Sequence, residues 1–104
     1  MAWFYLALAA LFEITFAMSM KMSEGFTRPL PTAVTVVAVA GGITFLTLAM
    51  KTLPVSVAYP IWTAVGALGT IFLGWMWLGE SLTTLKIVSA LAIVGGVMGL
   101  RATV

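Results

Sequence analysis

Residues Ala2–Met20, AWFYLALAALFEITFAMSM, form an almost unbroken apolar run that ends at Lys21 and holds a single charged residue, Glu13. A helix rises 1.5 Å per residue, so about 20 such residues are needed to cross the hydrocarbon layer of a membrane. Because that layer holds no water, a segment of this length must form a helix to satisfy its own backbone groups. The stretch therefore predicts a first membrane-spanning helix over residues 2–20.

Three further apolar runs of similar length follow along the chain. They are separated by short polar segments rich in glycine, proline and charge, at Lys21–Pro29, Lys51–Pro54 and Gly79–Ser81. The expected spans are residues 30–50, 55–78 and 83–101. The sequence thus predicts an all-α membrane protein with four transmembrane helices in one domain, residues 1–104.

The composition supports a lipid environment and excludes several classes of function. Of the 104 residues 62% are apolar and 8% are charged, whereas about a quarter of a soluble domain is charged. The chain has no cysteine and no histidine, so disulfides, thiolate chemistry and His-ligated metals are excluded. A net charge of +2 is too sparse for a nucleic-acid partner. No phosphate loop, metal-ligand cluster or activated nucleophile is present, so we expect neither an enzyme nor a cofactor.

The basic residues divide almost evenly between the two sides of the predicted membrane span. One side holds Lys51 and Arg101, and the other holds Lys21, Arg28 and Lys86. Orientation is normally set by a clear Lys/Arg excess on the cytoplasmic side. Either one residue of bias selects an orientation, or the chain inserts both ways round.

Four short helices can hardly pack together and also line an aqueous path, so transport would need at least a dimer. Insertion both ways would allow an antiparallel dimer, which resembles the inverted repeat of larger transporters.

Glu13 is the only ionisable residue deep within a predicted span. An acid at this depth costs a few kcal/mol, and no Lys, Arg or His within the spans can pair with it. We expect Glu13 to face the interior and either to take up a proton or to bind a cation, as a carrier exchanging the two requires. The alternative is a permanently protonated acid bonded to a neighbouring carbonyl. Ala10 and Phe16 lie three residues away on the same face and would line the site.

The third span places two aromatic residues, Tyr59 and Trp62, on one helical face. Aromatic faces attract organic cations, so we expect the pair to line a cation cavity; the alternative is an interfacial aromatic belt. Pro60, Gly66 and Gly69 weaken the same helix and predict a conformational hinge. Close helix packing would explain the two glycines equally well.

The fourth span contains two overlapping pairs of small residues, spaced four apart. Such pairs favour close helix association, and no charged residue lies between Lys86 and Arg101. We expect this helix to make the dimer contact, through Ala92, Gly95, Gly96 and Gly99.

Together these motifs resemble the small multidrug resistance family of proton-coupled exporters, over essentially the whole chain. The shared features are an acid at position 13, Glu-Gly-Phe-Thr-Arg at 24–28, Leu53-Pro54 and Ala-Tyr59-x-Ile-Trp62-Thr63. The segments Lys51-Thr-Leu-Pro54 and Gly66-Ala-Leu-Gly69 are similar to the guanidinium-exporter subtype. The resemblance implies an antiparallel dimer in the bacterial inner membrane. Both Glu13 carboxylates would lie in one cavity lined by Tyr59, Trp62 and Thr63, where they bind either protons or a small organic cation.

The chain also departs from that pattern at positions that bear on the substrate. Phe16 replaces a usual Trp and Gly42 replaces a usual Ser, which removes two hydrogen-bond donors from the expected cavity. We therefore expect a broader panel of weakly bound cations, including quaternary ammonium compounds. The same departures could mark one half of a heterodimer with a paralogous subunit. A function of a different class, a non-transporting membrane subunit beside a larger complex, is the remaining alternative.

Overall fold

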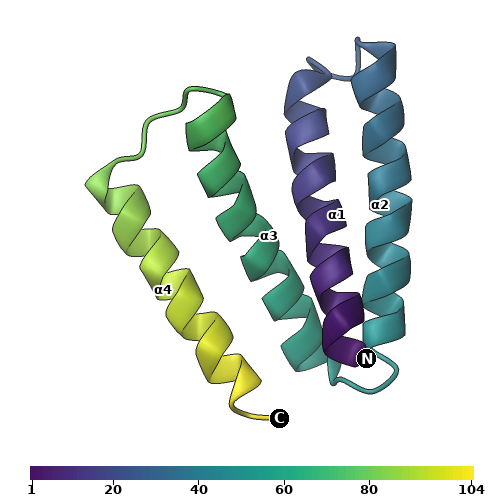
Figure 1. Cartoon of the computed structure of the whole chain (residues 1–104), viewed down its shortest axis with the longest axis vertical. Coiled ribbons are helices and arrows are strands. Elements are labelled where there is room, and N and C mark those ends of the chain that lie inside the picture. Colours follow the sequence, from purple (N-terminus) through teal and green to yellow (C-terminus); the bar gives the residue numbers. More distant parts are fainter.

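The computed structural model describes all residues 1–104 and contains four helices and no strand. The helices are α1 (Ala2–Met22), α2 (Pro29–Ala49), α3 (Val55–Trp77) and α4 (Thr84–Arg101) (Figure 1). All four are long and apolar enough to cross a membrane. The prediction of an all-α protein with four spans is confirmed, and the helix ends differ from the expected spans by at most two residues.

The four helices lie side by side in a flat layer, in the order α2, α1, α3, α4 (Figure 1). The chain measures 41 × 34 × 17 Å along its principal axes, and a helix with its side chains is about 10–12 Å across. The central helix α1 packs against both α2 and α3, whereas α4 packs along α3 and reaches α1 through Arg101, whose guanidinium lies over the Trp3 ring at 5.4 Å from its centroid. One copy of the chain is therefore little more than one helix thick.

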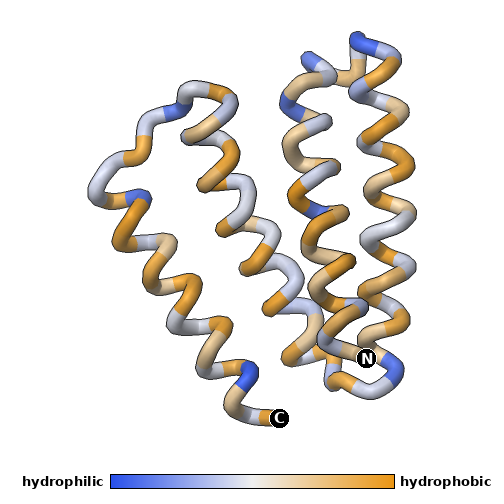
Figure 2. Tube along the Cα trace, in the orientation of Figure 1, coloured by the Kyte–Doolittle hydropathy of each residue, from blue (hydrophilic) through white to orange (hydrophobic).

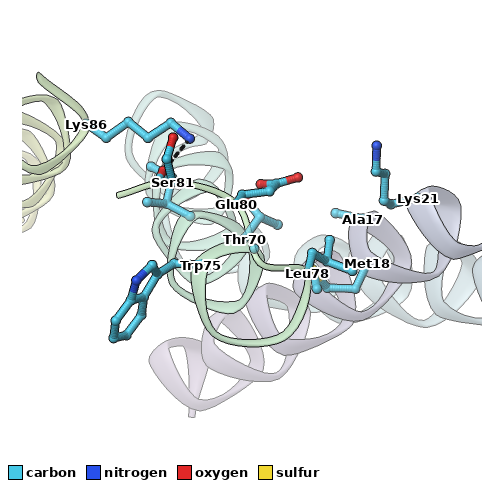
Figure 3. Close-up of a pocket in the computed structure, with 11 residues that line it drawn as sticks. Ala17, Met18, Lys21, Thr70, Trp75, Leu78, Glu80, Ser81 and Lys86 are labelled. Carbon is cyan, nitrogen blue, oxygen red and sulfur yellow. Dashed lines mark hydrogen bonds between the residues drawn. The ribbon is translucent and has the colours of Figure 1, made fainter. Parts of the chain in front are cut away.

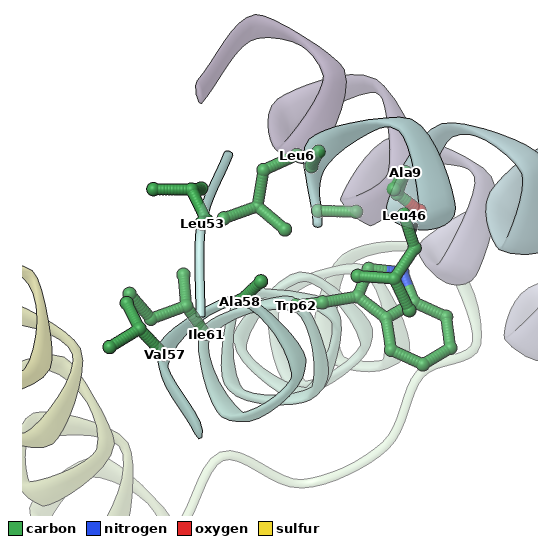
Figure 4. Close-up of a cluster of buried hydrophobic side chains, with 10 residues drawn as sticks. Leu6, Ala9, Leu46, Leu53, Val57, Ala58, Ile61 and Trp62 are labelled. Atoms are coloured by element: carbon green, nitrogen blue, oxygen red, sulfur yellow. Dashed lines mark hydrogen bonds between the residues drawn. The ribbon is translucent and has the colours of Figure 1, made fainter. Parts of the chain in front are cut away.

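The buried apolar core (Figure 4) consists of residues near the start of α1, the end of α2 and the start of α3, so it sits at the end of the layer that holds the N-terminus and the α2–α3 turn (Figure 1). There α1 and α3 lie close together, and toward the opposite end they diverge (Figure 1). Ten buried side chains from α1, α2, α3 and the α2–α3 turn make up this core: Leu6, Ala9, Ala10, Leu46, Ala49, Leu53, Val57, Ala58, Ile61 and Trp62. The layer is thus held together at one end and open between α1 and α3 at the other.

Apolar residues predominate along all four helices, and the most hydrophilic residues lie near the helix ends and in the turns, with the exception of Glu13 in the middle of α1 (Figure 2). Helix α4 has no buried residue at all, and Leu85, Leu91 and Met98 are 76%, 65% and 67% exposed. Such a surface is unfavourable in water and suits a lipid environment or a second protein surface.

Local sequence signals explain where the helices end. Pro29 begins α2, where its missing N–H leaves no helical bond unmade. Gly79 follows α3 with a positive φ of 69°, which lets the Glu80 N–H donate to the Gly74 carbonyl at 3.1 Å. The Thr83 side chain caps α4 by accepting from the Lys86 N–H at 3.2 Å.

Candidate functional site

Glu13 lies near the middle of α1, where this helix passes α3. Its Oε2 atom is buried and has no hydrogen-bond partner. It faces Gly66 of α3 so closely that a Cβ at that position would overlap the carboxylate. Buried polar atoms are nearly always hydrogen-bonded, so an unpartnered carboxylate oxygen in this position requires an explanation.

The two glycines predicted as part of a hinge both make room for α1 side chains. Gly66 accommodates the carboxylate of Glu13, and a Cβ at Gly69 would overlap the side chain of Ile14. Close helix contact therefore accounts for both positions in this conformation. Pro60 lies inside α3, where its ring removes one backbone hydrogen bond; the hinge itself stays a prediction.

Trp62 belongs to the buried core and is 8% exposed. Its indole Nε1–H donates to the Ala9 carbonyl oxygen at 2.9 Å (Figure 4). In an α-helix the same carbonyl accepts the N–H four residues later, which is that of Glu13. The Trp62 indole thus ties α3 to the helical turn that ends at Glu13. The indole N–H of Trp62 is therefore already hydrogen-bonded within the chain.

Tyr59 stands beside Trp62 with its ring edge-on, at 5.5 Å between centroids and 61° between planes. It is 52% exposed, so the predicted aromatic pair consists of one buried ring and one accessible ring. Only the Tyr59 ring offers a large open surface to a cation in this conformation.

Of the other predicted cavity residues, some are buried between the helices and one is exposed on the surface of the chain. Ala10 is buried next to Trp62 and borders an apolar cavity of about 240 Å³ between α1, α3 and α4. Phe16 is partly buried against the core. Gly42 lies on α2 against the α1 backbone, where an added Cβ would stand 3.3 Å from the Cβ of Phe12. Thr63 is exposed. A single copy of the chain therefore does not gather all of these residues around Glu13.

A second cavity, of about 270 Å³, opens between α1 and α3 at the divergent end of the layer (Figure 3). Its walls include Ala17 and Thr70, and its rim includes Lys21, Glu80 and Lys86. From the sequence, Glu80 belongs to the polar segment Gly79–Ser81 and Lys86 lies on the same side of the membrane as Lys21, but nothing in it shows that the three residues border one cavity. The available signal was the spacing of four between Glu13, Ala17 and Lys21, which places all three on one face of α1.

The four small residues of α4 make no close contact within the chain. An added Cβ at Gly95, Gly96 or Gly99 would meet nothing within 4 Å, and Ala92 is exposed. This face of α4 is free in a single copy and could receive another helix at close range.

Comparison with known proteins gives one consistent result. Residues 1–94 match the family described as Small Multidrug Resistance protein. A guanidinium exporter of Yersinia pseudotuberculosis is 44% identical over 101 residues, which cover 97% of each chain. Guanidinium exporters of Citrobacter freundii and Salmonella typhimurium are 41% identical over 97% of this chain and 96% of theirs. With its four membrane-spanning helices, the chain is an integral protein of the bacterial inner membrane and belongs to the small multidrug resistance family.

Proposed function

We propose that this chain is a proton-coupled antiporter that exports small organic cations, of guanidinium or quaternary ammonium type, by alternating access around Glu13. The observation that carries the proposal is the buried, unpartnered Oε2 of Glu13, in a chain whose basic residues all lie at helix ends or in turns and so away from the depth of Glu13. A proton or an organic cation can each satisfy that oxygen. Because both would occupy the same group, one must leave before the other binds, and this competition couples their movements in opposite directions.

The working unit in this proposal is an antiparallel homodimer. Three features support it: the free small-residue face of α4, the near-balance of basic residues between the two sides, and the difference between the two ends of the chain, where the cavity at the divergent end is bordered by Lys21, Glu80 and Lys86 and the one at the opposite end is apolar apart from Arg101. Two copies in opposite orientations would present such openings to opposite sides of the membrane. Exchange of conformation between the copies would then expose the Glu13 carboxylates to each side in turn.

The substrate class rests on the relatives and on the residues around Glu13. The relatives named above are guanidinium exporters, which supports export of a small delocalised cation. The Phe16 side chain has no N–H, and Gly42 has no side-chain hydroxyl, to orient a planar guanidinium. We therefore propose a broader range that includes substituted guanidinium and tetra-alkylammonium ions, each bound weakly.

The test is exchange by the purified chain in liposomes that carry a pH gradient. External guanidinium or tetra-alkylammonium should drive protons out of the vesicles, followed with a pH-sensitive dye. Glu13→Gln should abolish this exchange, and Glu24→Gln, which removes an exposed loop carboxylate, should leave it intact. Exchange that persists in the Glu13→Gln variant would overturn the proposal.

The same preparation separates the alternatives to a homodimeric carrier. A non-transporting subunit would show no exchange and no proton release on cation binding in detergent. Half of a heterodimer would be inactive alone and would gain exchange only when combined with a paralogous subunit. A titration from guanidinium to tetra-alkylammonium ions tests the substrate range, and strict preference for unsubstituted guanidinium would contradict it.

A further inference from the structure

We propose that Glu80 is a specificity residue for cations, acting at the mouth of the path to Glu13. Its carboxylate offsets the charge of two lysines on the same rim and so keeps this mouth open to positively charged substrates. The inference rests on the proposed function and concerns a residue outside the membrane-spanning part of the site.

The cavity between α1 and α3 lies close to Glu13 along both helices. On α1 its inner wall is Ala17, one helical turn beyond Glu13, and on α3 it is Thr70, one turn beyond Gly66. One turn of four residues rises about 6 Å. The cavity therefore ends about one helical turn from the place where the Glu13 carboxylate meets Gly66, and it lies on the same faces of both helices.

The turn at Gly79 and the missing side chain of Gly74 hold Glu80 at the rim of the cavity. Gly79 turns the chain back after α3, and the Glu80 N–H donates to the Gly74 carbonyl at 3.1 Å. The side chain folds over α3 so that Oε1 takes the space that a Cβ at Gly74 would need. Glu80 is exposed, yet its carboxylate is turned onto the cavity wall (Figure 3). Gly74 thus allows the carboxylate to lie along the rim.

The rim of the cavity carries two basic residues and one acidic residue. Lys21 of α1 and Lys86 of α4 border the same cavity (Figure 3). The Lys86 Nζ donates to the Ser81 carbonyl at 2.8 Å, which holds that ammonium beside the opening. Neither lysine forms an ion pair with Glu80 within 4 Å. With Glu80 ionised the rim carries a net charge of about +1, and without it about +2.

A mouth with two uncompensated lysines would repel the cations that the protein is proposed to carry. Exposed charges about 8 Å apart change the local concentration of a monovalent ion by about two- to threefold in water at low ionic strength. The Debye length falls from about 30 Å at 0.01 M salt to below 8 Å at 0.3 M, so the effect should fade as salt is added. The alternative role for Glu80 is that of a solvated loop acid that merely ends α3.

The experiment measures the KM for external cation in proteoliposomes at low and at high salt. Glu80→Gln should raise KM about two- to threefold at 0.01 M salt and have almost no effect at 0.3 M, with an unchanged maximal rate and proton stoichiometry. Lys21→Gln should lower KM under the same low-salt condition. Glu24→Gln is the matched control, because it removes one loop carboxylate that does not border the cavity.

Three outcomes would overturn the inference: equal KM values for Glu80→Gln and Glu24→Gln, a KM change that is insensitive to salt, or a Lys21→Gln effect in the same direction as Glu80→Gln. Each of these requires a wild-type protein that transports. Failure of the proposed function would be distinct, because then the wild type would show no exchange or Glu13→Gln would retain it.

Discussion

At the scale of single residues, the site depends on a carboxylate that fits only because its neighbour has no side chain. The contact between Glu13 and Gly66 joins α1 to α3. A side chain at Gly66 would push the carboxylate out of this position, and the close packing of protein interiors leaves little room to absorb the change.

Gly66→Ala should therefore impair cation binding more than it impairs folding. We expect the affinity to fall about five- to 150-fold, because overpacking of one methyl group costs about 1–3 kcal/mol when its neighbours cannot move. Titration calorimetry in detergent measures the affinity, and circular dichroism monitors helix content. Gly42→Ala is the graded comparison: its Cβ would lie 3.3 Å from Phe12, so its effect should be small. Equal effects of the two substitutions would contradict this account.

Trp62→Phe tests the hydrogen bond between the indole and the Ala9 carbonyl. The carbonyl keeps its helical donor, so the loss should be that of one hydrogen bond, about 0.5–1.5 kcal/mol of unfolding free energy. Unfolding with a denaturing detergent measures it. Trp77→Phe, at a position 72% exposed, should change stability little. An unchanged stability for Trp62→Phe would show that this bond does not hold α3 to α1.

Part of the residue-level site could be predicted from the sequence. Glu13 stood out because an acid without a basic partner in an apolar run has few structural explanations. Its contact with Gly66 could not be predicted, since it depends on how α1 and α3 are rotated against each other. The Trp62 hydrogen bond was equally hidden, because a Tyr59/Trp62 face fits a cavity wall and a helix interface alike. The roles of the predicted lining residues stay predictions.

At the scale of the helices, the fold was largely readable from the lengths of the apolar runs. Each run had to be a helix of nearly fixed length because the membrane leaves the backbone no other hydrogen-bonding solution. The end of α1 was the least well predicted, since Lys21 and Met22 continue the helix beyond the apolar run. Which helices are neighbours does not follow from hydropathy, and the weak attachment of α4 is a finding of the structure.

Pro60→Ala tests whether α3 works as a hinge. The substitution supplies an N–H that can bond the Ser56 carbonyl, and it should stiffen the first turns of α3. We expect unchanged cation affinity and slower exchange in liposomes. Pro60→Gly restores the same N–H but keeps the backbone flexible, so it should exchange faster than the alanine variant. An alanine variant that exchanges at the wild-type rate would count against the hinge.

Gly96→Leu tests the free face of α4. Nothing within the chain lies near an added Cβ, so the single copy should keep its structure while close association of two helices is blocked. Chemical cross-linking in membranes should detect loss of the dimer, with helix content preserved. Ala40→Leu, at an exposed position of α2, is the control and should leave cross-linking unchanged. A dimer that survives Gly96→Leu would place the contact elsewhere.

At the scale of the whole molecule, the question is how copies are oriented in the membrane. The natural chain has no cysteine, so single cysteines can be introduced without a competing thiol. If the chain inserts both ways round, Thr27→Cys and Thr52→Cys, in turns at opposite ends of the helices, should each be labelled to about half by a membrane-impermeant thiol reagent. Full labelling of one variant and none of the other would establish a single orientation and exclude the antiparallel dimer.

The flatness of the chain bears on its behaviour in a bilayer. The chain is 17 Å thick, so both of its broad faces contact lipid acyl chains. Lipid molecules and a second copy of the chain therefore compete for the same surface. Pairing then obeys mass action in two dimensions. Lateral dilution with added lipid should lower the exchange rate per chain once encounters become rare, while each diluted copy keeps its helices. A rate per chain that is constant over a hundredfold range of dilution would mean that pairs, once formed, hardly ever part.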